Sequence, residues 1–138
     1  MSKKHINWVA EYELGIRDID FQHHYFLDLI NRLSDELGSI DNLTYQAALI
    51  SELNAYARFH FISEENIMGR AGYPMLDEHK RHHLELIDQL TTKEARLQMD
   101  RSETRAKDII DFLVEWFLKH TTHEDRLFSD YLQNKGQA

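Results

Sequence analysis

Seven side chains that could ligate a metal ion recur at helical spacings along this sequence of 138 residues. They comprise five histidines and two carboxylates: His23, His60, Glu64, His79, His83, His120 and Asp125. Most lie on the apolar faces of their segments, since residues three and four apart share one face of a helix. Unpaired ionisable groups are costly to bury, and no row of Lys or Arg accompanies these residues. The pattern therefore predicts a buried metal site.

Two spacings within this set are the most informative. His79 and His83 lie four residues apart, so that two imidazoles can chelate one ion. Glu64 follows His60 by four residues on an apolar stripe, where a carboxylate needs a cation. A single histidine on such a stripe is more often a hydrogen-bonded core residue, but here that explanation would have to hold for the whole set at once.

Comparison with known classes of metal site limits which metal this ligand set could bind. The chain has no cysteine, which excludes thiolate zinc sites and cysteine-ligated iron–sulfur clusters. No glutamate is followed by a histidine three residues later, as in ferritin-like di-iron proteins, and the metalloprotease His-Glu-x-x-His motif is absent. Seven ligands are too many for one tetrahedral zinc. Two octahedral ions suit them better, and the mixture of imidazole and carboxylate favours iron.

The remaining four histidines are not expected to ligate metal. His5 belongs to the N-terminal arm, while His24 and His82 each adjoin a ligand candidate, so that their side chains should face solvent. His123 follows His120 by three residues and is interpreted as an edge residue of the site.

The composition limits the class of partner. With 16 Lys and Arg against 24 Asp and Glu, the net charge is −8, which argues against nucleic acid and anionic membranes. No apolar run could span a bilayer, and the N-terminal segment lacks the apolar core of a signal peptide. A cytoplasmic protein is therefore expected.

Breaker residues divide the chain into an N-terminal arm and four segments of helical period. Because short connections make successive helices antiparallel, the sequence predicts one all-α domain over residues 1–138, an antiparallel up-down-up-down four-helix bundle. The arm covers 1–17, turns are expected at 38–42, 69–74 and 99–102, and helices roughly at 19–37, 44–69, 75–98 and 103–133. The expected apolar stripe of the last helix contains Ile109, Leu113, Trp116, Phe117, Leu127 and Tyr131.

Taken in order, these residues resemble the bacterial hemerythrins over nearly the whole chain. The resemblance is carried by residues 19–23, 60–65, 73–74 with His79 and His83, and 116–120 with Asp125, and Trp8 and residues 15–16 also fit. It implies two iron ions, joined by an oxo or hydroxo bridge, in a non-haem di-iron centre that binds dioxygen reversibly. Glu64 and Asp125 would be bridging carboxylates, and the five histidines would divide three and two between the irons in an assignment that stays open.

The resemblance also implies a pocket for dioxygen. The ligands and the bridge would leave one position open on the irons, and the few carboxylates would limit the reaction to a two-electron transfer that gives a bound hydroperoxide and returns dioxygen. Trp116 and Phe117 are expected to line the pocket and exclude water. Thr121 is expected to make it more polar than in relatives with a bulky apolar residue there.

The second bridging carboxylate is the least regular member of the set. On an ideal helix Asp125 lies about 140° around from His120, whereas Glu124 lies about 40° away. Ideal geometry therefore favours Glu124, while the resemblance favours Asp125. A one-residue π-bulge, which is common at functional sites, would reconcile the two, so we expect a helix irregularity between His120 and Asp125.

The leading functional hypothesis is a binding protein rather than an enzyme: an oxygen carrier, store or sensor with dioxygen as its ligand. The alternatives are a di-iron enzyme that consumes peroxide or nitric oxide, and a metal-free interaction bundle. No signalling domain is expected within these residues, which weakens the hypothesis of a built-in sensor. The expected protein partner is an unidentified signalling or oxygen-consuming protein.

Overall fold

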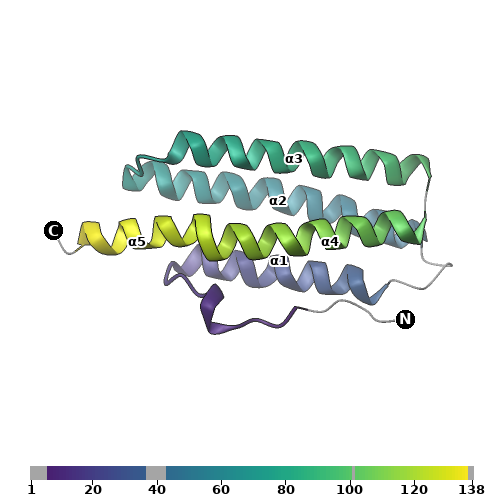
Figure 1. Ribbon diagram of the computed structural model, residues 1–138, viewed down its shortest axis with the longest axis horizontal. Helices are drawn as coiled ribbons and strands as arrows, with labels where there is room; N and C mark the ends of the chain where they lie inside the picture. The colour runs from purple at the N-terminus through teal and green to yellow at the C-terminus, as the bar shows by residue number, and fades with distance from the viewer. Residues whose placement is uncertain (1–5, 37–42, 101, 137–138) are drawn as a thin grey trace.

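The computed structural model describes residues 6–36, 43–100 and 102–136, without the side chains of residues 121, 122 and 136. Its main helices are α1 (Arg17–Asp35), α2 (Leu43–Ala71), α3 (Leu76–Met99) and α4 (Glu103–Lys119). They form an antiparallel up-down-up-down four-helix bundle, in which each helix packs on its neighbours in the chain and α4 returns to α1 (Figure 1). None of the described helices is both long and apolar enough to cross a membrane.

The fourth helix is interrupted near its middle. After α4 the chain makes a π-helical turn, η3 (His120–Glu124), and continues as α5 (Asp125–Gly136). The backbone N–H of Asp125 donates to the carbonyl of His120, five residues back, which is the bond that defines a π turn. The irregularity expected between these two residues is therefore present.

The π turn shifts the register of the buried positions that follow it. Leu127 was expected on the apolar stripe, but it is 51% exposed, whereas Phe128 is completely buried. The prediction for Leu127 was wrong because it continued an ideal 3.6-residue period through a turn that holds one extra residue.

Two glycines set the ends of the helices that carry the site. Gly72 has a φ of +71° directly after α2, and the N–H of Tyr73 donates to the carbonyl of Met68, as in a Schellman cap. Gly15 has a φ of +81° before α1. The carboxylate of Asp20 accepts from the N–H groups of Leu14 at 2.8 Å and Gly15 at 3.0 Å, so the first turn of α1 holds the bend of the arm.

The N-terminal arm, whose described part includes the 3-10 turn η1 (Ala10–Tyr12), packs along the bundle. Arg126 donates to the carbonyls of Glu11 and Glu13, and the Ser129 hydroxyl donates to the carbonyl of Leu14 at 2.6 Å. The arm is thus tied to α5. The expected turn at 38–42 lies outside the described residues.

Two apolar clusters fill the interior. The larger spans α1 to α4 and includes Leu33, Ile50, Leu90 and Ile110. The smaller contains Leu14, Ile19, Met68, Tyr73 and Phe128. His23 lies between Ile19 and Phe26, Glu64 between Phe61 and Met68, and His120 and Asp125 between Phe117 and Phe128, so a polar layer separates the two clusters.

Candidate metal centre

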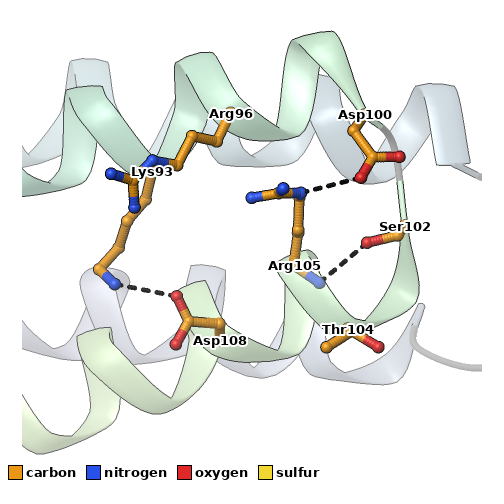
Figure 2. A pocket seen from close by; sticks show the side chains of 7 residues that line it. All are labelled: Lys93, Arg96, Asp100, Ser102, Thr104, Arg105 and Asp108. Atoms are coloured by element: carbon orange, nitrogen blue, oxygen red, sulfur yellow. Dashed lines mark hydrogen bonds and ion pairs between the residues drawn. The ribbon is translucent and has the colours of Figure 1, made fainter.

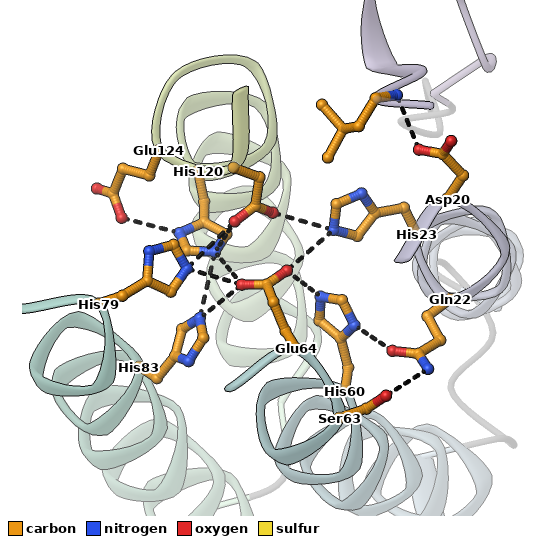
Figure 3. A network of polar contacts seen from close by, with 12 residues as sticks. Asp20, Gln22, His23, His60, Ser63, Glu64, His79, His83, His120 and Glu124 are labelled. Atoms are coloured by element: carbon orange, nitrogen blue, oxygen red, sulfur yellow. Dashed lines mark hydrogen bonds and ion pairs between the residues drawn. The ribbon is translucent and has the colours of Figure 1, made fainter. Parts of the chain in front are cut away.

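All seven ligand candidates meet in this polar layer. His23 comes from α1, His60 and Glu64 from α2, His79 and His83 from α3, and His120 from η3 (Figure 3). Asp125 comes from the start of α5. None of them is more than 5% exposed. Residues from every helix of the bundle therefore converge on one buried point.

Glu64 lies between two groups of histidines. Its Oε1 faces three Nε2 atoms, at 2.7 Å for His79, 3.2 Å for His83 and 3.5 Å for His120. Its Oε2 faces two others, at 3.4 Å for His60 and 3.9 Å for His23. We call the first group the three-histidine half and the second the two-histidine half. One carboxylate thus presents one oxygen to each half.

Asp125 repeats this arrangement from the opposite side. Its Oδ1 lies 2.9 Å from Nε2 of His120 and 3.2 Å from Nε2 of His79, in the three-histidine half. Its Oδ2 lies 3.1 Å from Nε2 of His23, in the two-histidine half. Each carboxylate is therefore placed to bridge two metal positions.

The π turn decides which carboxylate reaches the centre. Asp125 is 1% exposed, while the side chain of Glu124 is 21% exposed and lies outside the ring of histidines. Glu124 instead accepts from Nδ1 of His120 at 3.0 Å and contacts Nδ1 of His82 at 3.1 Å. The extra residue of the π turn thus brings the short Asp125 side chain inward.

Two further side chains outside the ligand set fix histidine rings. Nδ1 of His60 donates to the amide oxygen of Gln22 at 2.7 Å, and Nδ1 of His83 donates to the carboxylate of Glu65 at 2.8 Å. The amide nitrogen of Gln22 in turn donates to Ser63. These bonds commit the Nδ1 proton to the outside and leave Nε2 free to face the centre.

Sequence reasoning assigned no supporting role to Gln22, Glu65 or Glu124. Glu65 belongs to neither set of ligand atoms, but its carboxylate accepts from Nδ1 of His83. Each of these three residues adjoins a ligand candidate in the sequence. A polar residue next to a ligand candidate is therefore the signal that could have identified them.

Aromatic rings close the layer on the side of the larger apolar cluster. Phe61 stacks on His83 with ring centroids 3.8 Å apart, and Trp116 stacks on His120 at 4.6 Å. Phe117 meets His23 edge-on at 5.7 Å. Trp116 and Phe117, which were expected to line a pocket for dioxygen, thus lie against the histidines. Phe61, which was not foreseen, lies there as well. The side chain of Thr121 lies outside the described part of the chain.

Three of the other histidines are described, and none of them joins this centre. His24 is exposed and stacks on Trp8 at 3.5 Å, and His123 is exposed. His82 does not simply face solvent, as was expected, because it is half-buried against Glu124. His5 lies outside the described residues.

Burial and contacts among the ligand candidates shift the pKa values of the centre in different directions. Burial lowers the pKa of His60 to about 3, so this imidazole is neutral. Burial alone would raise the pKa of Glu64, but hydrogen bonds from the three-histidine half hold it well below its usual range. Burial also opposes the charge of His79, yet its close contacts with the carboxylates of Asp125 and Glu64 raise its pKa to about 9. Contacts with Asp125 likewise raise the pKa of His120 against the effect of burial.

Several buried polar atoms of the centre have no hydrogen bond. They are both ring nitrogens of His23, Nε2 of His60, Oε2 of Glu64 and both carboxylate oxygens of Asp125. Buried polar groups are rarely left without partners, because each such group costs about 1–3 kcal/mol. All four residues belong to two sets of ligand atoms that lie within 4.8 Å of one another: Glu64 with the three-histidine half, and Glu64 and Asp125 with the two-histidine half. The donor set therefore fits two metal ions.

Comparison with known proteins points to one family. The chain matches the family model described as the hemerythrin HHE cation binding domain over residues 14–132. It is 30% identical over 129 residues to a bacteriohemerythrin of Clostridium acetobutylicum, covering 89% of this chain and 98% of that protein. A bacteriohemerythrin of Stenotrophomonas maltophilia is 29% identical over 126 residues, covering 91% and 80%. The crystal structure of a hemerythrin variant with one leucine replaced by alanine superposes with a TM-score of 0.83 at 25% identity, covering 91% of this chain and 95% of that one.

Proposed function

The chain belongs to the hemerythrin family, and on that premise we propose that it binds dioxygen reversibly at a non-haem di-iron centre, as an oxygen carrier, store or sensor. The observation that carries the proposal is the pair of ligand sets that share a bridging carboxylate in a fully buried layer. When bound, two iron ions supply reversible two-electron chemistry toward dioxygen, and the protein supplies binding and orientation.

The donor count favours the two-histidine half as the place where dioxygen binds. Glu64 and Asp125 each offer one oxygen to each half, so the two halves have the same number of carboxylate donors. The two-histidine half has one imidazole fewer. At octahedral ions, it therefore leaves more positions for a small exogenous ligand.

The surroundings favour reversible binding over oxidative catalysis. Phe61, Trp116 and Phe117 pack on the histidine rings and keep water from one side of the centre. With five imidazoles and only two carboxylates, the ligand set places little negative charge on the metal positions. A site of this kind is better suited to hold and release dioxygen than to drive it on to stronger oxidants.

Optical spectra through one oxygenation cycle test this function. The protein is purified in air, reduced without oxygen and exposed to oxygen again, and we expect the oxygenated spectrum to return over repeated cycles without net turnover. About two irons per chain are expected, and chelation should lower the melting temperature, because metal binding is linked to folding.

Two results would count against the proposal. One zinc and no iron per chain, after expression in iron-replete medium, would overturn the di-iron assignment. Steady consumption of peroxide or nitric oxide, without a reversible oxygen cycle, would make the protein an enzyme.

A further inference from the structure

A centre as buried as this one needs a route by which metal ions enter. None of its seven ligand candidates is more than 5% exposed, so an ion must pass through a layer of side chains. Such a route is one of the features that a genuine buried metal site must possess. A cavity that serves as this route must both suit a cation and reach the centre.

One cavity combines both properties. It has a volume of ≈ 170 Å³, lies between the start of α3 and the η3 turn, and includes His79 of the centre in its lining. Glu78, His82, His123 and Glu124 line it as well. Its lining holds two carboxylates, Glu78 and Glu124, which attract a cation, and imidazoles, which suit divalent iron. The cavity therefore offers the kinds of ligand that a ferrous ion takes.

Other cavities lack this combination. A cavity of ≈ 330 Å³ reaches His120 and is lined by Glu85 and Glu124, but Lys119, whose ammonium group opposes a cation, also lines it. A cavity of ≈ 450 Å³ at the turn between α3 and α4 is lined by Lys93, Arg96 and Arg105 and reaches none of the seven ligand candidates (Figure 2). The groove of ≈ 320 Å³ between α1 and α2 is mostly aromatic.

The contacts of His82 and His79 join the surface to the centre. His82 has a 36% exposed side chain, and its Nδ1 lies 3.1 Å from Glu124. Glu124 also contacts His120 of the centre. His79, which lines the same cavity, turns its Nε2 toward Glu64 at 2.7 Å and Asp125 at 3.2 Å. An ion held by the outer residues is thus one side chain away from both bridging carboxylates.

We propose that this cavity is the entry site for divalent metal, where Glu78, His82 and His123 capture a ferrous ion and pass it inward past His79. The step is an exchange of ligands: bound water is replaced by imidazole and carboxylate, and the ion keeps its charge. This inference rests on the proposed function, because it assumes that the buried centre holds iron.

Uptake of ferrous ion by the full-length, chelator-stripped protein tests the proposal. Iron is added without oxygen, a strong ferrous chelator stops uptake at set times, and the iron retained by the protein is counted. The double variant His82→Ala/His123→Ala should take up iron several-fold more slowly, because the entry loses two imidazole ligands while its carboxylates remain. Its final iron content should match that of the wild type.

A surface charge provides a second variant that removes no ligand. Leu127 lines the cavity and is 51% exposed, so Leu127→Lys adds a cation beside the entry. Leu84 is 71% exposed and lines none of these cavities, so Leu84→Lys is the matched control. Leu127→Lys should slow uptake several-fold at low salt, and Leu84→Lys should not.

The outcomes separate this proposal from the function on which it rests. Equal uptake rates for the wild type, the double histidine variant and Leu127→Lys would overturn the entry site. Equal slowing by Leu127→Lys and Leu84→Lys would also overturn it, since the charge would then act without regard to place. A wild-type protein that retains no iron at any time would instead contradict the di-iron centre.

Discussion

The two halves of the centre are equally buried but differently supported. In the three-histidine half, His83 and His120 each donate their outer N–H to a carboxylate, from Glu65 and Glu124. In the two-histidine half, His60 donates to the neutral amide of Gln22, and Nδ1 of His23 has no hydrogen bond.

This difference changes the donor strength of the rings. A carboxylate that accepts the outer proton of a metal-binding imidazole raises the basicity of the inner nitrogen, and a neutral amide does so less. The three-histidine half should therefore bind its metal ion more tightly and fill first. The half that is proposed to bind dioxygen is the more weakly supported one.

The largest expected effect comes from the residue that the halves share. Glu64→Ala should abolish metal binding in both, because each half loses one carboxylate oxygen. Glu65→Ala should cost less, since it removes only the outer support of His83. Iron content per chain measures both variants. Equal losses would mean that Glu64 is not a bridge.

The pair Asp125 and Glu124 separates a bridging role from a supporting role at adjacent positions. Asp125→Ala should also abolish the two-metal centre. Glu124→Ala should lower affinity in the three-histidine half by about 10–100-fold, the usual cost of losing an outer partner. Metal titration followed by calorimetry distinguishes the two. Strong binding of two ions by the Asp125 variant would refute its bridging role.

An exchange of outer partners should narrow the difference between the halves. Glu65→Gln gives His83 a neutral acceptor, and Gln22→Glu gives His60 a carboxylate. The first should weaken the tighter binding step and the second should strengthen the weaker one, each by about tenfold. Stepwise metal titrations of the two variants measure this. If the affinities of the two metal-binding steps differ by as much in these variants as in the wild type, the outer hydrogen bonds do not set that difference.

Without metal, the halves should respond to pH in opposite directions. The pKa of His60 falls to about 3 on folding, so its contribution to stability is present above its ordinary value of 6.5 and decreases below it. The pKa of His79 rises to about 9, so its contribution is complete below 6.5 and is lost as the pH rises through 9. Each group changes the free energy of unfolding by about 1.4 kcal/mol per pH unit within its range.

Chemical unfolding of the metal-free protein, prepared with a chelator, at several pH values checks this prediction. Stability should be greatest near pH 6.5 and decrease on both sides, with His60→Leu removing only part of the acidic decrease. Glu64, whose pKa is held low, adds to the loss below its ordinary value of 4.5. A stability that rises steadily from pH 6.5 to 9 would contradict the charge pairing in the three-histidine half.

The bundle and the burial of the ligand candidates could be predicted because they depend on periodicity. The 3.6-residue repeat shows which faces are apolar, and short turns force neighbouring helices to be antiparallel. The same repeat failed at Leu127, because a single extra residue in η3 cannot be seen in an average period. Resemblance, rather than periodicity, pointed to Asp125.

The outer hydrogen bonds could not be predicted in the same way. The bond from His83 to Glu65 joins α3 to α2, and that from His60 to Gln22 joins α2 to α1. Such pairs depend on the rotation of packed helices to within a fraction of a turn, which helix assignment does not give. Their sequence signal is limited to a polar residue beside each ligand candidate.

The stacking of the two tryptophans gives the protein two separate optical reporters. Trp116 lies on His120 at 4.6 Å with the rings 16° from parallel, so its fluorescence is exposed to any redox-active ion at the centre. Trp8 lies on His24 at 3.5 Å, on the N-terminal arm. In Trp8→Phe the remaining emission comes from Trp116 and follows metal occupancy. In Trp116→Phe the remaining emission comes from Trp8 and follows detachment of the arm. The native chain therefore needs no attached dye to show which of the two events comes first.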